Sequence, residues 1–400
     1  MVAAPGNAGI AQDVPCVALN ANDPVAVTNY AITKGIGLVV IGPEAPLVAG
    51  VSDALRERGI AVFGPSQAAA ALEGSKSFAK RIMDAAGVPT GRSVRAVTRG
   101  ETEAALDRFG APYVVKADGL AAGKGVLVTE DRAAALAHAD SYLSRGSVLI
   151  EEFLSGPEVS LFFLSDGDTI AALSPAQDFK RLRDGDEGPN TGGMGAYSPL
   201  PWLDERFGSE RAFVDTVART VALPVIRQMD AEGIPFVGLL YCGLILTDTG
   251  IQVIEFNARF GDPETEVVLP RLSTPLSTLL YAAATGTLET APTPVFTADA
   301  AVTVVLANEG YPGEPVTGRR ITGLHAASEV DGVHIDHAAT AVADEHDIVA
   351  VGGRVLNVVG LGADLSDART RAYRAIELID LEGAQFRSDI ALRASQGSHS

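Results

Sequence analysis

Apolar and polar residues alternate along the chain in blocks whose lengths predict short buried strands and amphipathic helices. In the first part, the runs Leu38–Gly42 and Ile60–Gly64 are apolar and end on glycine, which is typical of buried strands. A helix is predicted between them over Val51–Arg58. Strand, helix and strand in this order favour a parallel sheet, and such sheets bind ligands where their strands end. Those ends carry Gly42-Pro43-Glu44 and Gly64-Pro65-Ser66.

The middle of the chain has the pattern of antiparallel hairpins with helices beside them. Helices are predicted over Ser66–Gly87 and Asp131–Leu143. Short apolar runs bounded by Gly, Asp and Ser predict strands at Tyr113–Lys116, Val126–Val128, Ser147–Leu154, Val159–Leu164 and Thr169–Leu173. The last two strands are expected to pair across the turn Ser165–Asp168.

The pattern changes after residue 174. Residues 175–208 show little periodicity and many Gly, Pro, Asp and Asn residues, so we expect a long irregular loop that is functional or disordered. Thr287–Thr297 is interpreted as a linker and Ala394–Ser400 as a disordered tail. The remaining periodic segments predict helices at Glu210–Ala231, Thr274–Ala284 and Ser366–Ile379, and strands at Gly238–Leu246, Gln252–Asn257, Val302–Leu306 and Asp347–Val351.

Composition then narrows the function classes. The 400 residues are 47% hydrophobic and 20% charged, which is ordinary for a globular protein. The chain has 31 Lys and Arg residues and 50 Asp and Glu residues, so its net charge is −19. We therefore expect no general affinity for nucleic acid or anionic membranes. Cys16 and Cys242 are too few for a disulfide framework, and no basic region with an apolar run opens the chain. These features predict a cytoplasmic protein.

The segment Lys116–Gly125 concentrates glycine and lysine between two predicted strands. Its glycines let backbone N–H groups converge on an anion, and Lys116 and Lys124 add positive charge. The GxxxxGK[ST] pattern of a P-loop is absent. Taken alone, these residues support phosphate binding and an ordinary hairpin loop about equally.

A second candidate lies in the predicted strand that ends at Asn257. Residues two apart on a strand share a face, so Glu255 and Asn257 present two oxygen ligands side by side while Ile254 and Phe256 face the core. Hard oxygen donors of this kind suit Mg²⁺, which takes one or two carboxylates and fills its shell with water and phosphate. The alternative is an exposed polar strand face.

Two further segments carry weaker signals. The acids, bases, amides and Gly192-Gly193 pair of residues 178–197 suit either a substrate-closing lid or a solvated loop. The strand end at Glu151–Leu154, with Glu158 after it, offers backbone to an adenine edge and a carboxylate to ribose hydroxyls. The histidines form no HExxH motif or catalytic triad, so we expect no histidine general base.

Taken in order, these segments resemble the ATP-grasp superfamily and, more narrowly, its glycinamide ribonucleotide synthetase (phosphoribosylamine–glycine ligase) family. The resemblance covers nearly the whole chain. The strings that carry it are Pro5–Gly9, Gly42-Pro43-Glu44, Lys116–Gly125, Gly188–Gly195, Asn257–Thr265 and Gly352–Leu356. The Asn257–Thr265 string is highly specific, whereas the glycine-rich loop alone indicates only ATP-grasp.

The resemblance implies a mixed α/β (α+β) fold and a division into domains. It implies an N-terminal parallel α/β domain over residues 1–73, an ATP-grasp domain of two α+β subdomains over 74–296, a small C-terminal α+β domain over 297–394, and a tail over 395–400. It also implies a monomer.

The reaction implied by the resemblance is the joining of glycine to 5-phosphoribosylamine in purine synthesis, with ATP converted to ADP and phosphate. The glycine carboxylate would attack the γ-phosphate to form glycyl phosphate, and the amine would then displace phosphate. Such phosphoryl transfer depends on positioning and charge neutralisation. The small-molecule ligands would be ATP, Mg²⁺ or Mn²⁺, glycine and 5-phosphoribosylamine, without nucleic acid or membrane.

Roles for individual residues follow from the same resemblance. Arg259, Asp262 and Lys116 would act on the reacting groups, and Glu255 and Asn257 would hold the metal. ATP would be bound by Lys76, Lys116, Gly119, Gly123, Lys124, Gly125, Glu151, Glu152, Phe153, Leu154 and Glu158. The substrates would be bound by Gly6, Asn7, Pro43, Glu44, Asp178, Lys180, Asn190, Thr191, Gly192, Arg259, Pro263 and Glu264.

One departure from the family pattern leaves alternatives open. Ahead of the Pro5–Gly9 loop the family has a strand, a Gly-Gly-Arg-Glu-His turn and a helix, which this sequence lacks. That turn would hold the phosphate of phosphoribosylamine at a helix N-terminus. A smaller departure is Ile10, where Thr is more usual. The alternatives to the ligase are a truncated, catalytically impaired ATP-binding form of the same family and a different ATP-grasp ligase.

Overall fold

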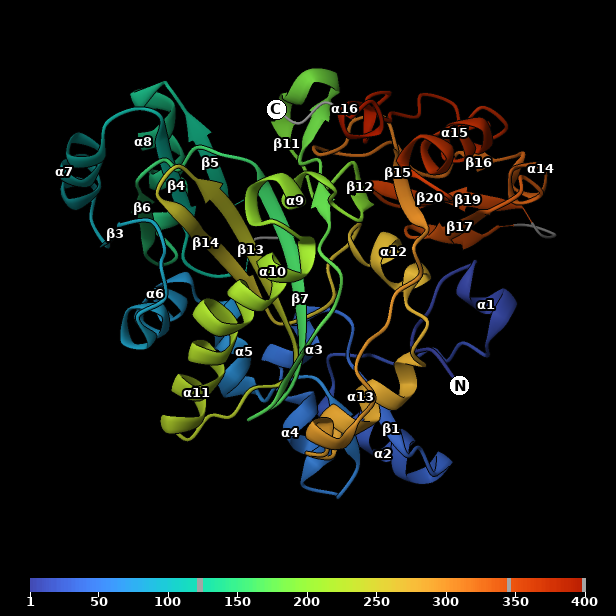
Figure 1. Ribbon diagram of the computed structural model, residues 1–400, viewed down its shortest axis with the longest axis horizontal. Helices are drawn as coiled ribbons and strands as arrows, with labels where there is room; N and C mark the ends of the chain where they lie inside the picture. Colours follow the sequence, from blue (N-terminus) through green and yellow to red (C-terminus); the bar gives the residue numbers. More distant parts are fainter. Residues whose placement is uncertain (121–124, 344–346, 398–400) are drawn as a thin grey trace.

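The computed structural model describes residues 1–120, 125–343 and 347–397. It is built from several sheets with helices on their faces, which confirms the mixed α/β fold (Figure 1). No helix in these residues is long and apolar enough to cross a lipid bilayer.

The N-terminal elements surround a small parallel sheet. Strands β1 and β2 pair in parallel, with Leu38 opposite Ala61, as the strand–helix–strand pattern predicts. Helix α4 crosses between them, and α2 packs against α4. The elements are α1 (Ile10–Asp13), α2 (Pro24–Lys34), β1 (Leu38–Val40), α3 (Glu44–Val48), α4 (Val51–Arg56), β2 (Ala61–Phe63) and α5 (Gln67–Gly74).

The predicted helix over Ser66–Gly87 is wrong in one respect, because it is divided at Ser75. The backbone of Ser75 is extended, and its hydroxyl accepts the N–H of Phe78, so that a new helix begins after it. Ser66 caps α5 in the same way through the N–H of Ala69. The division gives α6 its own N-terminus beside the glycine-rich loop.

The next elements form a small subdomain whose antiparallel sheet has the order β3-β6-β4-β5, with α7 and α8 packed against it. The predicted strands on either side of the glycine-rich loop are confirmed as β4 and β5, which pair directly. The expected strand Ser147–Leu154 is shorter than predicted. The elements are α6 (Lys76–Ala86), β3 (Ser93–Ala96), α7 (Arg99–Phe109), β4 (Tyr113–Ala117), β5 (Val126–Thr129), α8 (Arg132–Leu143) and β6 (Val148–Glu151).

The central sheet has the order β14-β13-β7-β8 and is antiparallel throughout. The predicted pairing across Ser165–Asp168 is confirmed as β7–β8, and the strands predicted at Gly238–Leu246 and Gln252–Asn257 pair with each other as β13 and β14. Helices α5 and α6 pack on β14, and α13 packs on β7 and β13. The strands and the main helices are β7 (Glu158–Asp166), β8 (Ile170–Ala172), α10 (Glu210–Val217), the π-turn η2 (Ala218–Ala222), α11 (Leu223–Ala231), β13 (Val237–Thr247), β14 (Gly250–Asn257) and α13 (Leu276–Ala284).

The expectation that residues 175–208 form an irregular loop is wrong. Their strand β12 pairs with β15 of the C-terminal part on one side and with β9 on the other. A sequence window cannot reveal this pairing, because the partner strand lies about a hundred residues away. The elements are β9 (Gln177–Asp178), β10 (Arg181–Arg183), η1 (Asp184–Asp186), β11 (Glu187–Asn190), β12 (Gly195–Ser198) and α9 (Trp202–Phe207).

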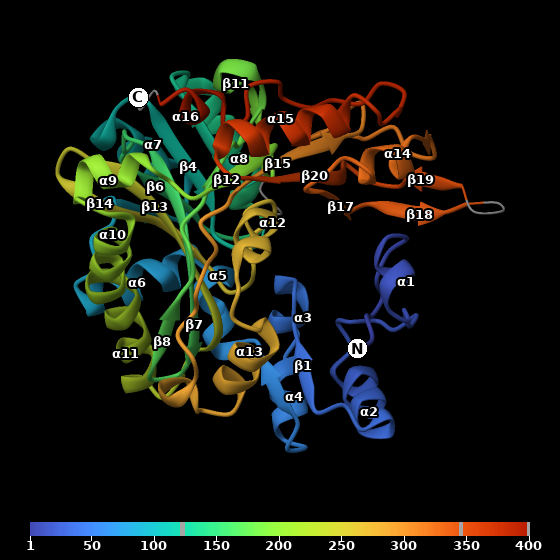
Figure 2. The same cartoon turned by 45° about the vertical axis from the view of Figure 1, so that its right-hand side comes forward.

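The C-terminal sheet therefore has the order β17-β20-β15-β12-β9. Helix α15 covers one face of it and the short α12 packs on the other. Figure 2 shows α1 lying below the β17 and β18 strands. The remaining elements are α12 (Thr265–Val268), η3 (Leu269–Arg271), η4 (Leu288–Thr290), β15 (Ala300–Ala307), β16 (Arg320–Ile321), α14 (Leu324–Ser328), β17 (Val333–His337), β18 (Thr340–Val342), β19 (Ile348–Ala350), β20 (Arg354–Gly362), α15 (Leu365–Ile376) and α16 (Leu392–Ser395).

Candidate active site

A chain of buried charges joins the subdomain sheet to the central sheet. Lys116 Nζ lies 2.8 Å from Glu151 Oε2, and Lys80 Nζ lies 3.3 Å from Glu151 Oε1. Lys116 also donates to the carbonyl oxygen of Ile254 at 3.2 Å. Burial alone would lower the pKa of the Lys116 ammonium, but Glu151 and Glu255 outweigh it and raise that pKa. Lys116 is therefore a fixed cation that faces the end of β14.

Lys80 was not identified from the sequence. It lies on α6 among the buried residues Ala79, Ile82 and Met83, and it donates to Thr90 Oγ1 and to the carbonyl of Gly91, both at 2.8 Å. A lysine on the apolar face of an amphipathic helix is the signal that could have revealed it, since buried lysines need partners.

The proposed metal pair lies on one face of β14. A β-bulge at Ile254 places Val253 and Phe256 in the core and Glu255 and Asn257 on the opposite face. The prediction that Ile254 faces the core is therefore wrong, because the bulge turns this residue out of the alternation. The carbonyl of Ile254 instead accepts the bond from Lys116.

The surroundings of Glu255 fit a divalent cation. Burial raises the pKa of Glu255, but Lys180, Lys116, Lys76 and Arg259 together hold it below its usual value. Within the described residues, neither Glu255 nor Asn257 makes a side-chain hydrogen bond, so their oxygens are available. No group of three or more His, Cys, Asp or Glu able to hold a metal occurs in that part of the chain. The donor set thus suits an ion that takes few protein ligands and completes its shell with phosphate.

The glycine-rich loop is anchored at its first turn by Asp118. Its carboxylate accepts bonds from the hydroxyls of Ser75 (3.1 Å), Ser77 (2.6 Å) and Ser147 (2.9 Å) and from the N–H of Ser77 (3.2 Å). Although burial opposes it, this hydrogen bonding lowers the pKa of Asp118. The loop therefore starts from a rigid point at the N-terminus of α6.

The rest of the predicted phosphate loop is only partly described. Lys76 Nζ lies 3.5 Å from the carbonyl of Gly119. The carbonyl of Gly125 accepts the N–H of Ala117 at 2.8 Å, which closes the base of the loop. Gly123 and Lys124 lie outside the described residues, so their predicted roles stay predictions.

The predicted adenine hinge presents open backbone. Phe153 is 46% exposed, and the N–H groups of Phe153 and Leu154 have no partner in the part of the chain that the structure describes. The Glu152 side chain turns away to Arg92, whose N–H and Nε it accepts at 2.7 and 2.6 Å. The side chain of Glu151 points to the lysines. The Glu152 N–H is bonded to the carbonyl of Arg92 at 3.0 Å, so the N–H groups left open to a nucleotide here are those of Phe153 and Leu154.

The segment that carries Asp178, Lys180, Asn190 and Thr191 reaches the same place. Lys180 Nζ lies 2.6 Å from Glu158 Oε2, which joins two predicted ligand-binding residues. Thr191 donates its hydroxyl (2.9 Å) and its N–H (2.8 Å) to the carbonyl of Lys180. Asn190 lies opposite Arg181 in the β10–β11 hairpin.

Asp178 gives a testable pH dependence. Burial raises its pKa to about 7, Glu264 and Glu158 add to this rise, and Lys180 opposes it. Between pH ~4 and ~7 the folded chain therefore keeps a proton that the unfolded chain releases, and stability falls as pH rises. We expect Asp178→Asn to remove this fall and make the slope of unfolding free energy against pH less negative, by up to ~1.4 kcal/mol per unit. The slope is measured by urea unfolding of the wild type and of Asp178→Asn between pH ~4 and ~7. Equal slopes for the two proteins would contradict the raised pKa of Asp178.

Arg259 connects the N-terminal part to the end of β14. Its Nε lies 3.4 Å from Glu44 Oε2 and 3.3 Å from Glu73 Oε1. Glu73 in turn accepts the N–H of Ala258 at 2.8 Å. Because Glu44 follows Pro43 at the start of α3, the predicted substrate residues of the first sheet are brought to Arg259.

The loop after β14 meets the Gly192-Gly193 pair. Gly193 has φ +115°, and a Cβ there would lie 2.4 Å from Pro263 Cδ, so only glycine fits. Arg354 of β20 ties both segments together through bonds from Nη1 to the carbonyls of Gly192 (2.8 Å) and Asp262 (2.7 Å). Arg354 was part of the Gly352–Leu356 string but received no role from the sequence.

Glu264 is buried beneath these loops. Its Oε1 accepts the hydroxyls of Tyr241 at 2.5 Å and Ser160 at 3.2 Å. Tyr241 also contacts Ser160 at 2.8 Å. This arrangement holds the Glu264 side chain against the central sheet, and neither hydroxyl partner was identified from the sequence.

Gly6 and Asn7 lie at a different place. Asn7 donates to the carbonyls of His337 and Ala338, and its oxygen accepts the N–H groups of Gly9 and Ile10. The loop is thus attached to the end of β17. Within the described residues, its side-chain contacts do not reach the charges around Glu255.

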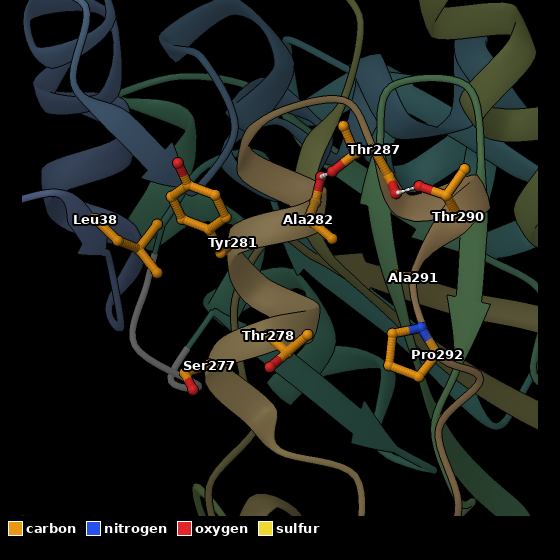
Figure 3. A pocket seen from close by; sticks show the side chains of 9 residues that line it. All are labelled: Leu38, Ser277, Thr278, Tyr281, Ala282, Thr287, Thr290, Ala291 and Pro292. Atoms are coloured by element: carbon orange, nitrogen blue, oxygen red, sulfur yellow. Dashed lines mark hydrogen bonds between the residues drawn. The ribbon is translucent and has the colours of Figure 1, made fainter.

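An open groove of about 580 Å³ lies between α13, η4 and β1 (Figure 3). Leu38, Tyr281 and Pro292 are among its lining residues, none of which is charged. The hydroxyls of Thr287 and Thr290 donate to carbonyls of their own segment. This groove offers no charge to a phosphorylated ligand, and the candidate site is the region around Glu255.

Comparisons with known proteins point to one protein family over nearly the whole chain. Family models described as the N domain, the ATP-grasp (A) domain and the C domain of phosphoribosylglycinamide synthetase match residues 1–73, 74–265 and 301–393. The phosphoribosylamine–glycine ligase of Leifsonia xyli is 67% identical over 98% of this chain and 94% of its own length. That of Streptomyces coelicolor is 57% identical over 98% and 92%.

Solved structures show the same relationship. The crystal structure of phosphoribosylamine–glycine ligase from Thermotoga maritima has a TM-score of 0.80 and 33% identity, covering 98% of this chain and 93% of that one. The biotin carboxylase domain of the Hydrogenobacter thermophilus 2-oxoglutarate carboxylase, in complex with MgADP, has a TM-score of 0.66 at 17% identity, over 96% and 86%. The second likeness shows a shared fold.

Proposed function

The chain belongs to the phosphoribosylglycinamide synthetase family, and we propose that it is the ATP-dependent ligase that joins glycine to 5-phosphoribosylamine. The products are glycinamide ribonucleotide, ADP and phosphate, and the reaction belongs to purine biosynthesis. Besides the family membership, the observation that carries the proposal is the bond from Lys116 to the carbonyl of Ile254, next to Glu255. Lys180, Lys116, Lys76 and Arg259 also lower the pKa of the Glu255 carboxyl.

This arrangement suits phosphoryl transfer. The reaction brings a carboxylate to a polyphosphate, and the like charges must be neutralised before they approach. Lys116 and Lys76 lie beside the glycine-rich loop, where they would bind ATP phosphates. Lys180 and Arg259 lie on the side of the predicted substrate residues, where they would bind the glycine carboxylate and orient it for attack. No covalent enzyme nucleophile is required, because the intermediate is glycyl phosphate.

We propose Mg²⁺, with Mn²⁺ as a substitute, as the metal held by Glu255 and Asn257. When bound, it supplies positive charge that offsets the charge of the transferring phosphoryl group. Glu255 is kept ionised by its cationic neighbours and Asn257 adds a neutral oxygen.

The other predicted roles remain proposals. The open backbone of Phe153 and Leu154 would bind adenine together with the predicted Glu151 and Glu152, and Glu158 would contact the ribose. Arg259 and Asp262 would act near the phosphoryl group and the amine. The substrate side would be lined by Pro43, Asn190, Thr191, Gly192, Pro263 and Glu264. The predicted substrate roles of Gly6 and Asn7, whose loop is attached to the end of β17, also remain proposals. We also propose the domain division at residues 73, 296 and 394, a monomer and a cytoplasmic location.

The two alternatives are less well supported. Matches to the N, A and C domains of one family do not favour a catalytically impaired form. A different ATP-grasp ligase is disfavoured because relatives named phosphoribosylamine–glycine ligase reach 67% identity, whereas the carboxylase domain is 17% identical.

The proposal is tested by measuring ADP release with ATP, Mg²⁺, glycine and 5-phosphoribosylamine generated in situ. Each component is omitted in turn, and glycinamide ribonucleotide is identified by mass spectrometry. We expect ADP and the ribonucleotide to form together only in the complete mixture. ADP formed at the same rate without glycine, or with another carboxylate in its place, would contradict the proposed substrate.

A further inference from the structure

Arg387, in the segment between α15 and α16, is the largest of the fully buried side chains, with 1% exposure. Its Nε and Nη2 donate to the two carboxylate oxygens of Asp389 at 2.7 and 2.8 Å. Its Nη1 donates to Asp186 Oδ1 at 2.7 Å and to the carbonyl of Arg181 at 3.2 Å. One guanidinium thus connects the C-terminal segment to strand β10 and to the turn η1 at the tip of the β10–β11 hairpin.

Two more contacts attach the tip of this hairpin to the same segment. The N–H of Gly185 donates to Asp389 Oδ2 at 2.8 Å. The carboxylate of Asp184 accepts the N–H of Ser388 at 2.8 Å and also its hydroxyl. Residues 183–189 are otherwise exposed to solvent. The hairpin therefore depends on Arg387 and its neighbours for its position.

The guanidinium also reaches the residues beside the candidate active site. It stacks on the ring of Phe179 with its carbon 4.9 Å from the ring centroid. Phe179 lies between Asp178 and Lys180 in the chain, and Lys180 forms the ion pair with Glu158. The returning strand adds Thr191, which bonds to the carbonyl of Lys180. A displacement of Arg387 would be transmitted to Lys180 from two sides.

We propose that Arg387 is a positioning residue for the ligase reaction: it holds the β10–β11 hairpin so that Lys180 keeps its place beside Glu158 in the candidate active site. This inference rests on the proposed function. In the proposed reaction Arg387 contacts neither the substrates nor the metal, and it acts through Phe179 and the β10–β11 hairpin. Lysine could not replace it, since an ammonium cannot form the fork to Asp389 together with the bond to Asp186.

The test uses the full chain with Arg387→Ala, Arg387→Lys and Asp186→Gly. The last variant removes one carboxylate at a position with φ +57°, which glycine adopts freely, and it leaves the buried arginine in place. Arg132→Ala is the control, because Arg132 of the distant helix α8 also forms a 2.7 Å pair with a carboxylate, that of Asp107 on α7. We measure kcat, KM for each substrate, ATP affinity and amide hydrogen exchange of residues 178–191.

We expect Arg387→Ala and Arg387→Lys to lower kcat by about 10- to 100-fold, because small misplacements of reacting groups have effects of this size. ATP affinity should change less than about threefold, and hairpin amides should exchange faster. Added guanidinium should restore part of kcat in Arg387→Ala alone. Asp186→Gly should show a smaller change in the same direction, even if Arg387→Ala does not fold.

Unchanged kcat and exchange in folded Arg387→Lys and in Asp186→Gly would overturn the proposal. A loss no larger than that of Arg132→Ala would also overturn it. If the wild-type chain lacked ligase activity, the proposed function would fail, whereas the hydrogen-exchange comparison would still decide whether Arg387 holds the hairpin.

Discussion

Replacing Glu255 by glutamine is expected to lower kcat by about three orders of magnitude. The exchange keeps the shape of the side chain but removes the only charge that the proposed metal pair contributes. It also leaves Lys180, Lys116, Lys76 and Arg259 without the carboxylate that they share. A bound metal ion typically contributes several kcal/mol to stabilising the transition-state charge, and each ~1.4 kcal/mol corresponds to tenfold in rate. The rate of ADP release at saturating substrates measures the effect.

The matched control is Gln252→Ala, since Gln252 is a partly buried polar residue of the same strand, three positions before Glu255. We expect it to retain near-normal turnover. Metal binding is followed separately by titrating Mn²⁺ into each protein with a nonhydrolysable ATP analogue, and Glu255→Gln should weaken it at least tenfold. A folded Glu255→Gln protein that binds Mn²⁺ as the wild type does and turns over at low Mg²⁺ would contradict the assignment.

Replacing Lys116 by methionine is expected to lower kcat/KM for ATP by about 10²- to 10³-fold. Methionine retains the apolar stem but removes the ammonium that lies between Glu151 and the carbonyl of Ile254. A single preorganised donor directed at developing charge has an effect of this size. Glu151 keeps Lys80 as a partner, so its charge is not left alone in the interior.

The control for this variant is Lys34→Met, at the exposed C-terminal end of α2. Lys34→Met removes one positive charge, as Lys116→Met does. Comparing the two variants therefore cancels any general effect of the net charge of −19 on nucleotide association. Isothermal titration of ATP and steady-state kinetics are measured on both variants. Equal kcat/KM in the two variants would exclude Lys116 from phosphate binding.

Much of the site could be predicted because it is carried by local strings. The two-residue period of a strand was enough to place Glu255 and Asn257 on one face, and β14 extends over both. The β4–β5 hairpin around the glycine-rich loop was also predicted correctly, because the apolar runs and the glycines lie within about fifteen residues. The roles of these residues stay predictions until the variants are measured.

The predictions that failed share a physical cause. Ile254 leaves the core because a bulge against β13 interrupts the alternation. The helix expected over Ser66–Gly87 divides because Ser75 caps a new helix beside Asp118, 43 residues away along the chain. Residues 175–208 form strands because β15 supplies a partner. In each case a contact made outside the local window, to a paired strand or to Asp118, changes the local pattern.

The sequence by itself determined the family and the mixed fold class, and it predicted a set of residues for phosphate and metal, since these depend on residue types at short spacings. Only the tertiary structure decided how the charges pair. It joined Lys80 to Glu151, placed Lys180 beside Glu158, and used Arg354 and Arg387 of the C-terminal part to hold loops of the central domain. A buried charge must find a partner wherever the fold brings one, and that partner is set by packing across the whole chain.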